Sequence, residues 1–199
     1  MTTSAPLHLT QNPAADALLS DDPNALLVGM VLDQQVPMKK AFSGPAMIAE
    51  RMGGRFDVAG IAETSEEDFV ALCAQKPAIH RFPGSMGARV HQVCRELVAS
   101  YDGDVSRLYE QAETGEDLRR ALAALPGFGT QKAAIFTALL GKQRGVTPPG
   151  WREASAPYGE EGSFTSVADI VDADSLQRVR ASKQAAKAAA KAASAAAEH

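Results

Sequence analysis

Cysteine is scarce in this sequence, and long apolar runs are absent. The 199 residues include only two cysteines, Cys73 and Cys94, so a disulfide framework is not expected and both should be buried thiols within helices. No apolar run approaches the roughly 20 residues that cross a bilayer. The N-terminus has no basic start followed by an apolar core, so we expect no signal peptide, no membrane partner and a cytoplasmic location.

Acidic residues are missing from two long segments, although the formal net charge of the chain is −4. Residues 118–152 contain six cations and no acid: Arg119, Arg120, Lys132, Lys142, Arg144 and Arg152. Residues 69–95 contain four: Lys76, Arg81, Arg89 and Arg95. A phosphate-binding face requires local positive potential rather than a basic pI. These cations are therefore expected to be unopposed and to face a polyanion, with ordinary solvated helix faces as the alternative.

Strand patterns of useful length are also absent, whereas helical patterns recur between turn signals. Residues 25–32 are apolar nearly all round, which is typical of a central helix. Ser65 and Thr114 each begin a capping-box pattern. Gly44-Pro45 predicts a break between helices over 38–43 and 46–52. With 45% apolar and 22% charged residues, the sequence predicts a globular, all-α protein.

Three segments are expected along the chain. Residues 1–22 read as a polar lead-in with little periodicity, and residues 23–180 as the helical domain. Residues 181–199 are alanine interspersed with Lys183, Lys187 and Lys191, without an apolar stripe. Such a segment favours a nascent helix and a mobile basic tail, which either attracts polyanions weakly or acts as a passive solubilising tail.

A glycine-flanked reversal lies between the helical patterns over 117–124 and 131–140. Its sequence is Leu125-Pro126-Gly127-Phe128-Gly129-Thr130. Glycine permits a tight reversal, Pro126 fixes φ, and Thr130 is expected to cap the following helix. The free N–H groups of the reversal and the positive end of the helix would together form a phosphate seat. A plain connection between two helices, with no ligand, is the alternative.

The segment 125–130, followed by Ala133-Ala134, resembles the helix–hairpin–helix of the HhH-GPD superfamily of DNA glycosylases, which includes endonuclease III, MutY and alkyladenine glycosylases. The resemblance covers roughly residues 24–152, and the Gly/Pro-rich loop over 141–152 forms its second half. It implies an all-α, two-lobed fold with a cleft between the lobes. It also implies that hairpin backbone amides bind a DNA phosphate.

The same resemblance implies a set of hairpin contacts. The DNA-binding candidates are Pro126, Gly127, Phe128, Gly129, Thr130, Gln131 and Lys132. A monovalent cation, Na⁺ or K⁺, would be held by the backbone of Leu125, Gly127 and Gly129. No iron–sulfur cluster is expected, because relatives that hold one use four cysteines in the C-terminal part and this chain has none after Cys94. No other cofactor is expected.

The apolar helix over 25–32 runs into Gln34-Gln35, which resembles a glutamine-bearing turn that lies over the DNA in the superfamily. The resemblance implies that Gln35, with Gln34 beside it, fills the gap left by a flipped base or lines its pocket. An amide pairs with base edges and carries no charge. His80, Arg81 and Trp151 are further candidates for the pocket or wedge. The alternatives are a self-capped helix end, a structural histidine and a core or lid tryptophan.

The catalytic residues of the superfamily have no one-to-one match here. The aspartate position falls near Pro149, and no carboxylate lies between Asp117 and Glu153. Glu153 is the nearest substitute, and Asp33 on the glutamine turn is a weaker candidate. The lysine of the bifunctional members falls on Gln131, with Lys132 one place later, so lysine-dependent lyase chemistry is not supported.

The resemblance therefore implies a base excision repair protein that binds double-stranded DNA, and we expect it to be a monomer. Its predicted activity is that of a monofunctional DNA glycosylase, which hydrolyses the N-glycosidic bond of a damaged or mispaired base. Two alternatives stay open. One is a non-catalytic helix–hairpin–helix DNA-binding module that has lost the catalytic aspartate. The other is a helical protein–protein adaptor without DNA affinity.

Overall fold

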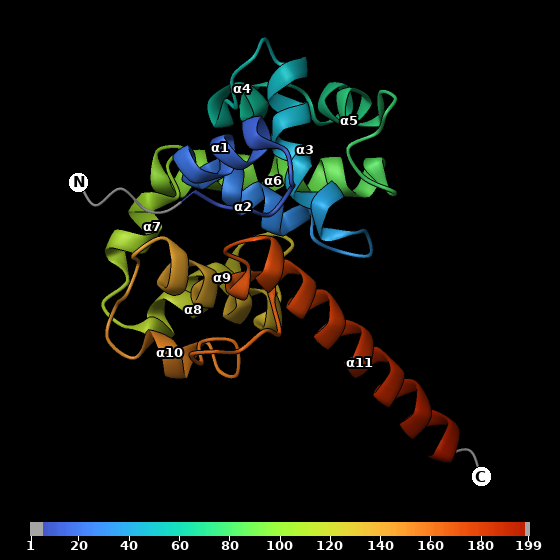
Figure 1. Ribbon diagram of the computed structural model, residues 1–199. Coiled ribbons are helices and arrows are strands. Elements are labelled where there is room, and N and C mark those ends of the chain that lie inside the picture. Colours follow the sequence, from blue (N-terminus) through green and yellow to red (C-terminus); the bar gives the residue numbers. More distant parts are fainter. Residues whose placement is uncertain (1–5, 198–199) are drawn as a thin grey trace.

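The computed structural model describes residues 6–197, with side chains for residues 6–189, and this part of the chain is helical without a strand. Two groups of helices lie one above the other (Figure 1). The upper group comprises α1 (Pro13–Asp21), α2 (Pro23–Leu32), α3 (Met38–Arg51), α4 (Val58–Glu63), α5 (Glu66–Ala74) and α6 (Pro83–Tyr101). The lower group comprises α7 (Ser106–Gln111), α8 (Gly115–Ala124), α9 (Thr130–Gln143), α10 (Trp151–Ala154), the 3₁₀ turn η1 (Val167–Asp169) and α11 (Ala173–Ala197). The predicted all-α class is confirmed.

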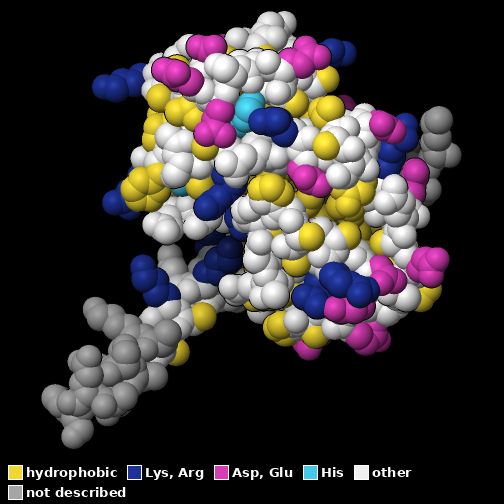
Figure 2. All heavy atoms as spheres, turned by 180° about the vertical axis from the view of Figure 1, so that it is seen from behind, with side chains coloured by type: hydrophobic (Ala, Val, Ile, Leu, Met, Phe, Trp, Pro, Cys, Tyr) yellow, Lys and Arg dark blue, Asp and Glu magenta, His cyan; other side chains and the backbone are white. Residues whose placement is uncertain are grey.

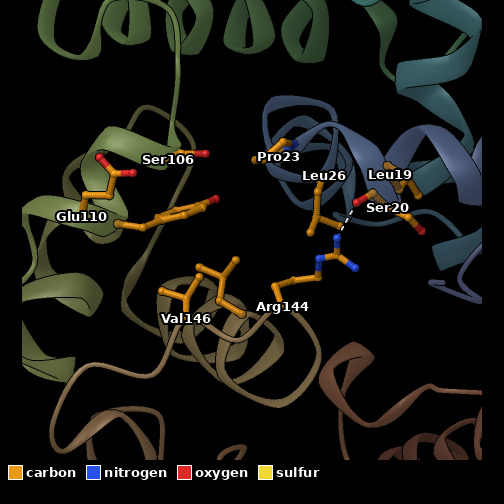
Figure 3. Close-up of a pocket in the computed structure, with 10 residues that line it drawn as sticks. Leu19, Ser20, Pro23, Leu26, Ser106, Glu110, Arg144 and Val146 are labelled. Atoms are coloured by element: carbon orange, nitrogen blue, oxygen red, sulfur yellow. Dashed lines mark hydrogen bonds between the residues drawn. The ribbon is translucent and has the colours of Figure 1, made fainter. Parts of the chain in front are cut away.

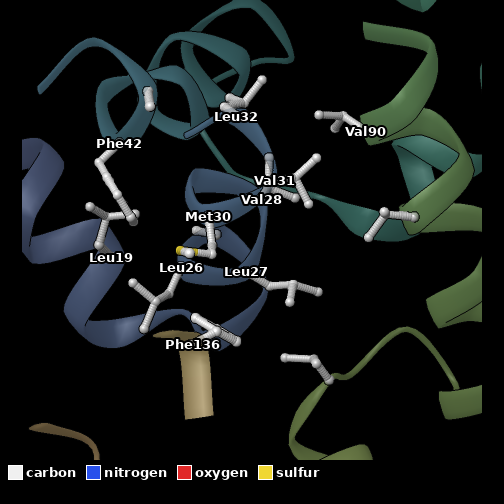
Figure 4. Packing of buried hydrophobic residues seen from close by; sticks show 14 of the residues in the cluster. Leu19, Leu26, Leu27, Val28, Met30, Val31, Leu32, Phe42, Val90 and Phe136 are labelled. Carbon is white, nitrogen blue, oxygen red and sulfur yellow. The ribbon is translucent and has the colours of Figure 1, made fainter. Parts of the chain in front are cut away.

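The two groups share one continuous hydrophobic core, with α2 at its centre. All residues of α2 from Ala25 to Leu32 are buried. Leu26 and Leu27 of α2 lie next to Phe136 of α9 in the core (Figure 4). Burial of a large apolar side chain contributes about 1.5–3 kcal/mol, so this contact fixes α9 against the upper group. The division into two lobes stays a prediction, because the core does not separate the groups.

The predicted capping boxes set the starts of two helices. The Ser65 hydroxyl accepts a hydrogen bond from Asp68 N at 3.1 Å at the start of α5. Thr114 and Asp117 exchange hydrogen bonds at the start of α8, where Thr114 N donates to the Asp117 carboxylate at 3.1 Å. Each cap satisfies N–H groups that the helix itself leaves unpaired, which typically contributes about 1 kcal/mol.

The N-terminal segment is more ordered than its sequence indicated. Leu7 and Leu9 are buried in the core, and Pro13–Asp21 forms α1. The Asp16 carboxylate accepts hydrogen bonds from Leu9 N at 3.0 Å and Thr10 N at 2.8 Å. The apolar positions of this nine-residue helix are mostly small alanines, so its sequence gives a weak helical signal and residues 6–22 read as a lead-in although they belong to the fold.

Gly44-Pro45 does not break α3. The helix continues through Pro45 to Arg51, and both residues are buried. A Cβ atom at position 44 would lie 2.3 Å from Leu32 Cδ1, so glycine is needed for the close packing of α3 on α2. Burial against α2 offsets the hydrogen bond that proline removes, which is why the predicted break is wrong.

Helix α11 passes position 181 without a break. Leu176 and Val179 in its first turns are buried, and the helix extends away from the lower group (Figure 1). The side chain of Lys191 and residues 198–199 lie outside the described part of the chain. Cys73 and Cys94 are buried free thiols, as predicted. Over residues 6–197, no helix has both the length and the apolarity of a bilayer span.

Candidate nucleic-acid interface

The reversal between α8 and α9 forms the predicted helix–hairpin–helix. Gly127 has φ +81°, the left-handed conformation that favours glycine. Phe128 N donates to Leu125 O at 3.1 Å and closes the turn. Gly129, rather than Thr130, is the N-cap of α9, and Thr130 is its first helical residue. The predicted Thr130 cap is therefore wrong by one residue, and its hydroxyl makes no capping bond.

Phe128 anchors the hairpin from below. Its side chain is 8% exposed and meets Phe136 edge to face, with 5.8 Å between ring centroids. Its burial fixes the hairpin on the core and removes the ring from any ligand that lies on the hairpin. Phe128 was predicted to contact DNA, and the structure gives its side chain a packing role instead.

The outer face of the hairpin is open. Gly129, Thr130 and Gln131 are exposed, and no atom lies within 4 Å of a Cβ added at Gly129. In the described part of the chain, the N–H groups of these three residues have no hydrogen-bond acceptor. Unpaired N–H groups at the start of a 14-residue helix form an anion site. The amides predicted to bind a phosphate are thus not covered by other side chains.

Arg89 of α6 joins the hairpin to the glutamine turn. A Cβ atom at Gly127 would lie 2.2 Å from Arg89 Cδ, so the arginine stem packs directly on the hairpin. Arg89 Nη1 donates to Gln34 Oε1 at 3.0 Å. The two segments that the resemblance assigned to DNA binding therefore lie beside one another, although about ninety positions separate them in the sequence.

Gln34 and Gln35 differ in whether their side-chain amides remain free to contact a ligand. Gln35 is exposed, has φ +56°, and its side chain makes no hydrogen bond within the described chain. Such a φ is uncommon for a non-glycine residue and is often found at functional sites. Gln34 is held by Arg89, as described above. Gln35 is therefore the better placed of the two amides to enter a duplex.

His80 is buried and positions the glutamine turn. Phe82 N donates to His80 Nδ1 at 3.0 Å, so Nε2 carries the proton and donates to Gln34 O at 2.9 Å. Burial lowers the pKa of the imidazole, which is therefore neutral at pH 7. Because both ring nitrogens are occupied, the predicted role as a base reader does not fit this geometry. Arg81 is exposed beside it, over the Phe82 ring at 5.1 Å, and Phe82 itself is 44% exposed.

A pocket of about 340 Å³ opens beside the first turn of α9. It is lined by residues of α2, α9, α11 and the 158–167 segment: Met30, Asp33, Gln131, Lys132, Ile135, Tyr158, Thr165, Ser166, Val167 and Lys183. Lys132 Nζ donates to Val31 O, the penultimate carbonyl of α2, at 2.9 Å. Gln131 Nε2 donates to the Tyr158 hydroxyl at 2.9 Å. Residues from both groups of helices thus line a half-open space, with polar and apolar walls, next to the open amides.

The pKa values of Asp33 and Lys132 are both shifted in this pocket, and each group influences the other. Burial raises the pKa of the Asp33 carboxyl, and Lys183 and Lys132 act in the opposite direction. Burial lowers the pKa of the Lys132 amine from 10.5 to about 8, opposed by Asp33 and reinforced by Arg89. A carboxyl with a raised pKa and an amine with a lowered pKa, facing one pocket, are the groups that acid–base chemistry at neutral pH requires.

Trp151 and Glu153 lie at the opposite end of the helix pair. A Cβ atom at Gly115 would be 2.3 Å from Trp151 Cα, and one at Gly141 would be 2.3 Å from Trp151 Cε3. Nine residues of helix, about 14 Å, separate Gly141 from Lys132. Arg152 covers the Trp151 ring at 4.4 Å, and Glu153 is exposed on α10. The geometry therefore assigns Trp151 to packing and does not favour Glu153 as a group at the pocket.

Most cations of the acid-free segment 118–152 are paired with acids just outside it. The pairs are Arg119–Glu116, Arg120–Asp117, Lys142–Asp169 and Arg152–Glu161. The expectation of unopposed cations is wrong for these four. Figure 2 shows Lys and Arg side chains gathered where α11 leaves the body, whereas those on the side away from α11 are interleaved with Asp and Glu. The positive field beside the hairpin comes from Lys132, Arg89 and Lys183.

A second cavity, of about 250 Å³, lies at the C-terminal end of α9. Arg144 in its wall donates to the carbonyl oxygen of Ser20, which joins α9 to α1 (Figure 3). Leu26 and Val146 contribute apolar wall (Figure 3). Because this cavity is some turns of α9 away from the hairpin, it does not extend the surface that the open amides define.

Two residues of the candidate site, Arg89 and Lys183, had no specific signal in the sequence. Arg89 was one cation among many, and Lys183 belonged to the alanine-rich tail. Asp33 was identified only as a weaker catalytic candidate, from its place on the glutamine turn. A further signal was its position at the end of the most apolar helix, where a charged side chain must reach the edge of the core.

The comparison with protein families identifies most of the chain. The model of the HhH-GPD superfamily base excision DNA repair protein matches residues 28–198, and thus extends beyond residue 152 into α11. Neither a curated protein nor a solved structure matches the chain. The family implies DNA binding and a part in base excision repair, in agreement with the open hairpin amides. The chain belongs to the HhH-GPD superfamily of base excision DNA repair proteins.

Proposed function

We propose that this protein is a monofunctional DNA glycosylase that hydrolyses the N-glycosidic bond of a damaged or mispaired base. The observation that carries the proposal is the pocket beside the hairpin, where Asp33 and Lys132 lie next to unpaired backbone amides. A phosphate on the amides would place the neighbouring nucleotide within reach of the pocket. An enzyme that acts on a base must take it out of the stack into such a site.

Binding would use the backbone of the hairpin and the exposed side chains around it. The amides of Gly129, Thr130 and Gln131 would hold a phosphate oxygen, and Arg89 and Lys132 would add positive charge. Gln35 and the exposed Phe82 ring would fill the space that the flipped base vacates, because unstacked neighbours need a replacement surface. One chain supplies the hairpin, the wedge and the pocket, which favours a monomer. We propose that this monomer acts on double-stranded DNA in the cytoplasm.

A monovalent cation fits the hairpin. The carbonyl oxygens of Leu125, Gly127 and Gly129 would hold it. Leu125 O already accepts from Phe128 N at 3.1 Å, and Gly129 O accepts from Ala133 N at 2.9 Å. A carbonyl oxygen has two lone pairs, so each of these two retains one for a cation. When bound, the ion would add positive charge beneath the phosphate.

The chemistry would be a substitution at C1′ of the sugar. Water forms a bond to C1′, the C1′–N bond breaks, and its electron pair leaves with the base, which takes up a proton. Asp33 would stabilise the positive charge that develops on the sugar and accept the proton of the water. Its raised pKa, caused by burial, makes its carboxylate a stronger base than an exposed aspartate.

Lys132 supports a second candidate activity. Its amine faces the pocket with a pKa lowered to about 8, so a fraction is neutral near physiological pH. A neutral amine in this place could displace the base itself and form an imine with the opened sugar. Borohydride treatment of a reaction mixture reduces such an imine to a stable protein–DNA cross-link. We expect no cross-link, because Lys132 Nζ is held by Val31 O; a cross-link lost in Lys132→Met would establish the bifunctional activity.

The test of the proposal compares two carboxylates. Labelled duplexes with single modified or mispaired bases are incubated with the protein, and abasic product is revealed by alkaline cleavage. We expect Asp33→Asn to lower the single-turnover rate about 10²–10⁴-fold, the usual contribution of a positioned acid or base, with unchanged duplex affinity. Glu153→Gln should change the rate less than twofold. The reverse result would restore Glu153, and duplex binding without base release would identify a non-catalytic module.

A further inference from the structure

The pocket beside α9 is rich in hydrogen-bond donors. Lys132 and Lys183 carry ammonium groups, and Gln131 has a second amide hydrogen besides the one that binds Tyr158. Because the Tyr158 hydroxyl accepts that bond, its own hydrogen is free to donate. Of the residues described as lining the pocket, Asp33 alone carries a carboxylate. A ligand that fits this set must present acceptor atoms toward these donors.

The charge of the pocket also disfavours a ligand that carries a positive charge. Two ammonium groups face one carboxylate, and Arg89 lies close enough to lower the pKa of Lys132 further. Tyr158 is the only aromatic side chain among the described lining residues. A cationic ring is stabilised in proteins by aromatic faces or excess carboxylates. This pocket provides one aromatic ring and an excess of positive charge, so a cationic base would be repelled.

We infer that the base removed by this protein is a neutral oxo-base, formed by deamination or oxidation, and not an N-alkylated cationic purine. Uracil, hypoxanthine and 8-oxoguanine present carbonyl oxygens along their edges, which accept from ammonium, amide and hydroxyl groups. The size of the pocket, about 340 Å³, lies in the range of sites that hold small molecules. This inference rests on the proposed glycosylase activity and adds the class of its substrate.

The experiment measures base release from four duplexes of one sequence, which contain uracil, hypoxanthine, 8-oxoguanine or 7-methylguanine at one position. Single-turnover rates are compared at equal saturation, and each duplex is also titrated for binding by fluorescence anisotropy. We expect at least one oxo-base to be released about tenfold faster than 7-methylguanine, the factor for roughly 1.4 kcal/mol of discrimination.

A matched pair of lysine variants tests whether the charge of the pocket causes the preference for an oxo-base. Lys183 and Lys187 are both exposed on α11, one helical turn apart, and of the two Lys183 lines the pocket. Lys183→Gln should lower the ratio of oxo-base to 7-methylguanine rates by about two- to fivefold, the range for one exposed charge. Lys187→Gln should leave the ratio unchanged. Equal effects of the two variants would show that the tail acts through general charge, and would overturn the assignment to this pocket.

Different outcomes of this experiment would refute the substrate class and the proposed glycosylase activity. Release of 7-methylguanine at a rate equal to or above every oxo-base would overturn the substrate class and leave the glycosylase activity established. Binding of all four duplexes without release of any base would overturn the glycosylase proposal, and the substrate class with it. Only preferential release of an oxo-base, weakened by Lys183→Gln, supports both.

Discussion

The two hairpin glycines should respond differently to the same substitution. Gly127 has φ +81°, which costs an L-residue about 1–2 kcal/mol. The added Cβ would also lie 2.2 Å from Arg89 Cδ and 2.7 Å from Arg89 Cγ. The arginine must move, and it then loses its hydrogen bond to Gln34, worth about 1 kcal/mol. We therefore expect Gly127→Ala to lower the free energy of unfolding by about 2 kcal/mol.

Gly129→Ala is the matched control for folding. Gly129 has φ −111°, which alanine adopts readily, and its Cβ would meet no atom within 4 Å. Loss of glycine at an N-cap costs less than about 1 kcal/mol. The new methyl group would, however, lie on the open face where a phosphate is proposed to bind. Gly129→Ala should therefore fold like the wild type and bind DNA more weakly.

Thermal unfolding and duplex titration separate the two effects. For a chain of this size about 1 kcal/mol corresponds to 2–4 °C in Tm, so Gly127→Ala should lower Tm by about 4–8 °C and Gly129→Ala by less than half of that. Loss of one amide–phosphate hydrogen bond, about 1.4 kcal/mol, should raise the Kd of either variant about tenfold. Wild-type affinity in Gly129→Ala would refute the reasoning, because the open amides would then not contact DNA.

Two further predictions concern the other end of α9 and the pocket. Gly141→Ala should lower the free energy of unfolding by about 1–3 kcal/mol, because its Cβ would lie 2.3 Å from the rigid Trp151 ring. The same variant should leave the duplex Kd unchanged. A Kd increase as large as in Gly129→Ala would place Trp151 at the DNA. Raising the pH through about 8 should weaken duplex binding, because the Lys132 amine loses its charge there. Lys132→Arg, which stays charged, should flatten this dependence in anisotropy titrations, and an unchanged pH profile would contradict the role of Lys132.

The sequence predicted what depends on neighbouring residues. The hairpin, the helices that flank it and the caps at Ser65 and Thr114 are local features, since glycine conformation and side-chain capping act over a few positions. The central place of α2 followed from its uninterrupted apolar character. The continuation of α3 through Pro45 was missed because close packing on Leu32, a tertiary contact, outweighs a local preference.

The pocket could not be predicted by the same means. Asp33 and Lys132 come together only because α9 packs on the end of α2, and the hydrogen bond from Lys132 to Val31 spans 101 positions. A motif carried over from a family places residues by their distance along the chain, and so pointed first to Glu153 and only weakly to Asp33. Packing places Glu153 away from the pocket, because Gly115 and Gly141 hold α10 at the far end of the α8–α9 pair.

The hydrogen bond between Lys132 and Val31 also shows how the hairpin and the pocket would act as one site in the proposed function. The first turn of α9 presents its amides outward, at Gly129 and Thr130, and directs Gln131 and Lys132 toward the pocket. A single helical turn thus fixes the distance between the held phosphate and the groups proposed to act on the sugar. Lys132 then ties this turn to the carbonyl end of α2, which carries Asp33 directly afterwards. Because preorganised groups must be held to within a fraction of an ångström, a rigid link of this kind is what a hydrolytic site requires.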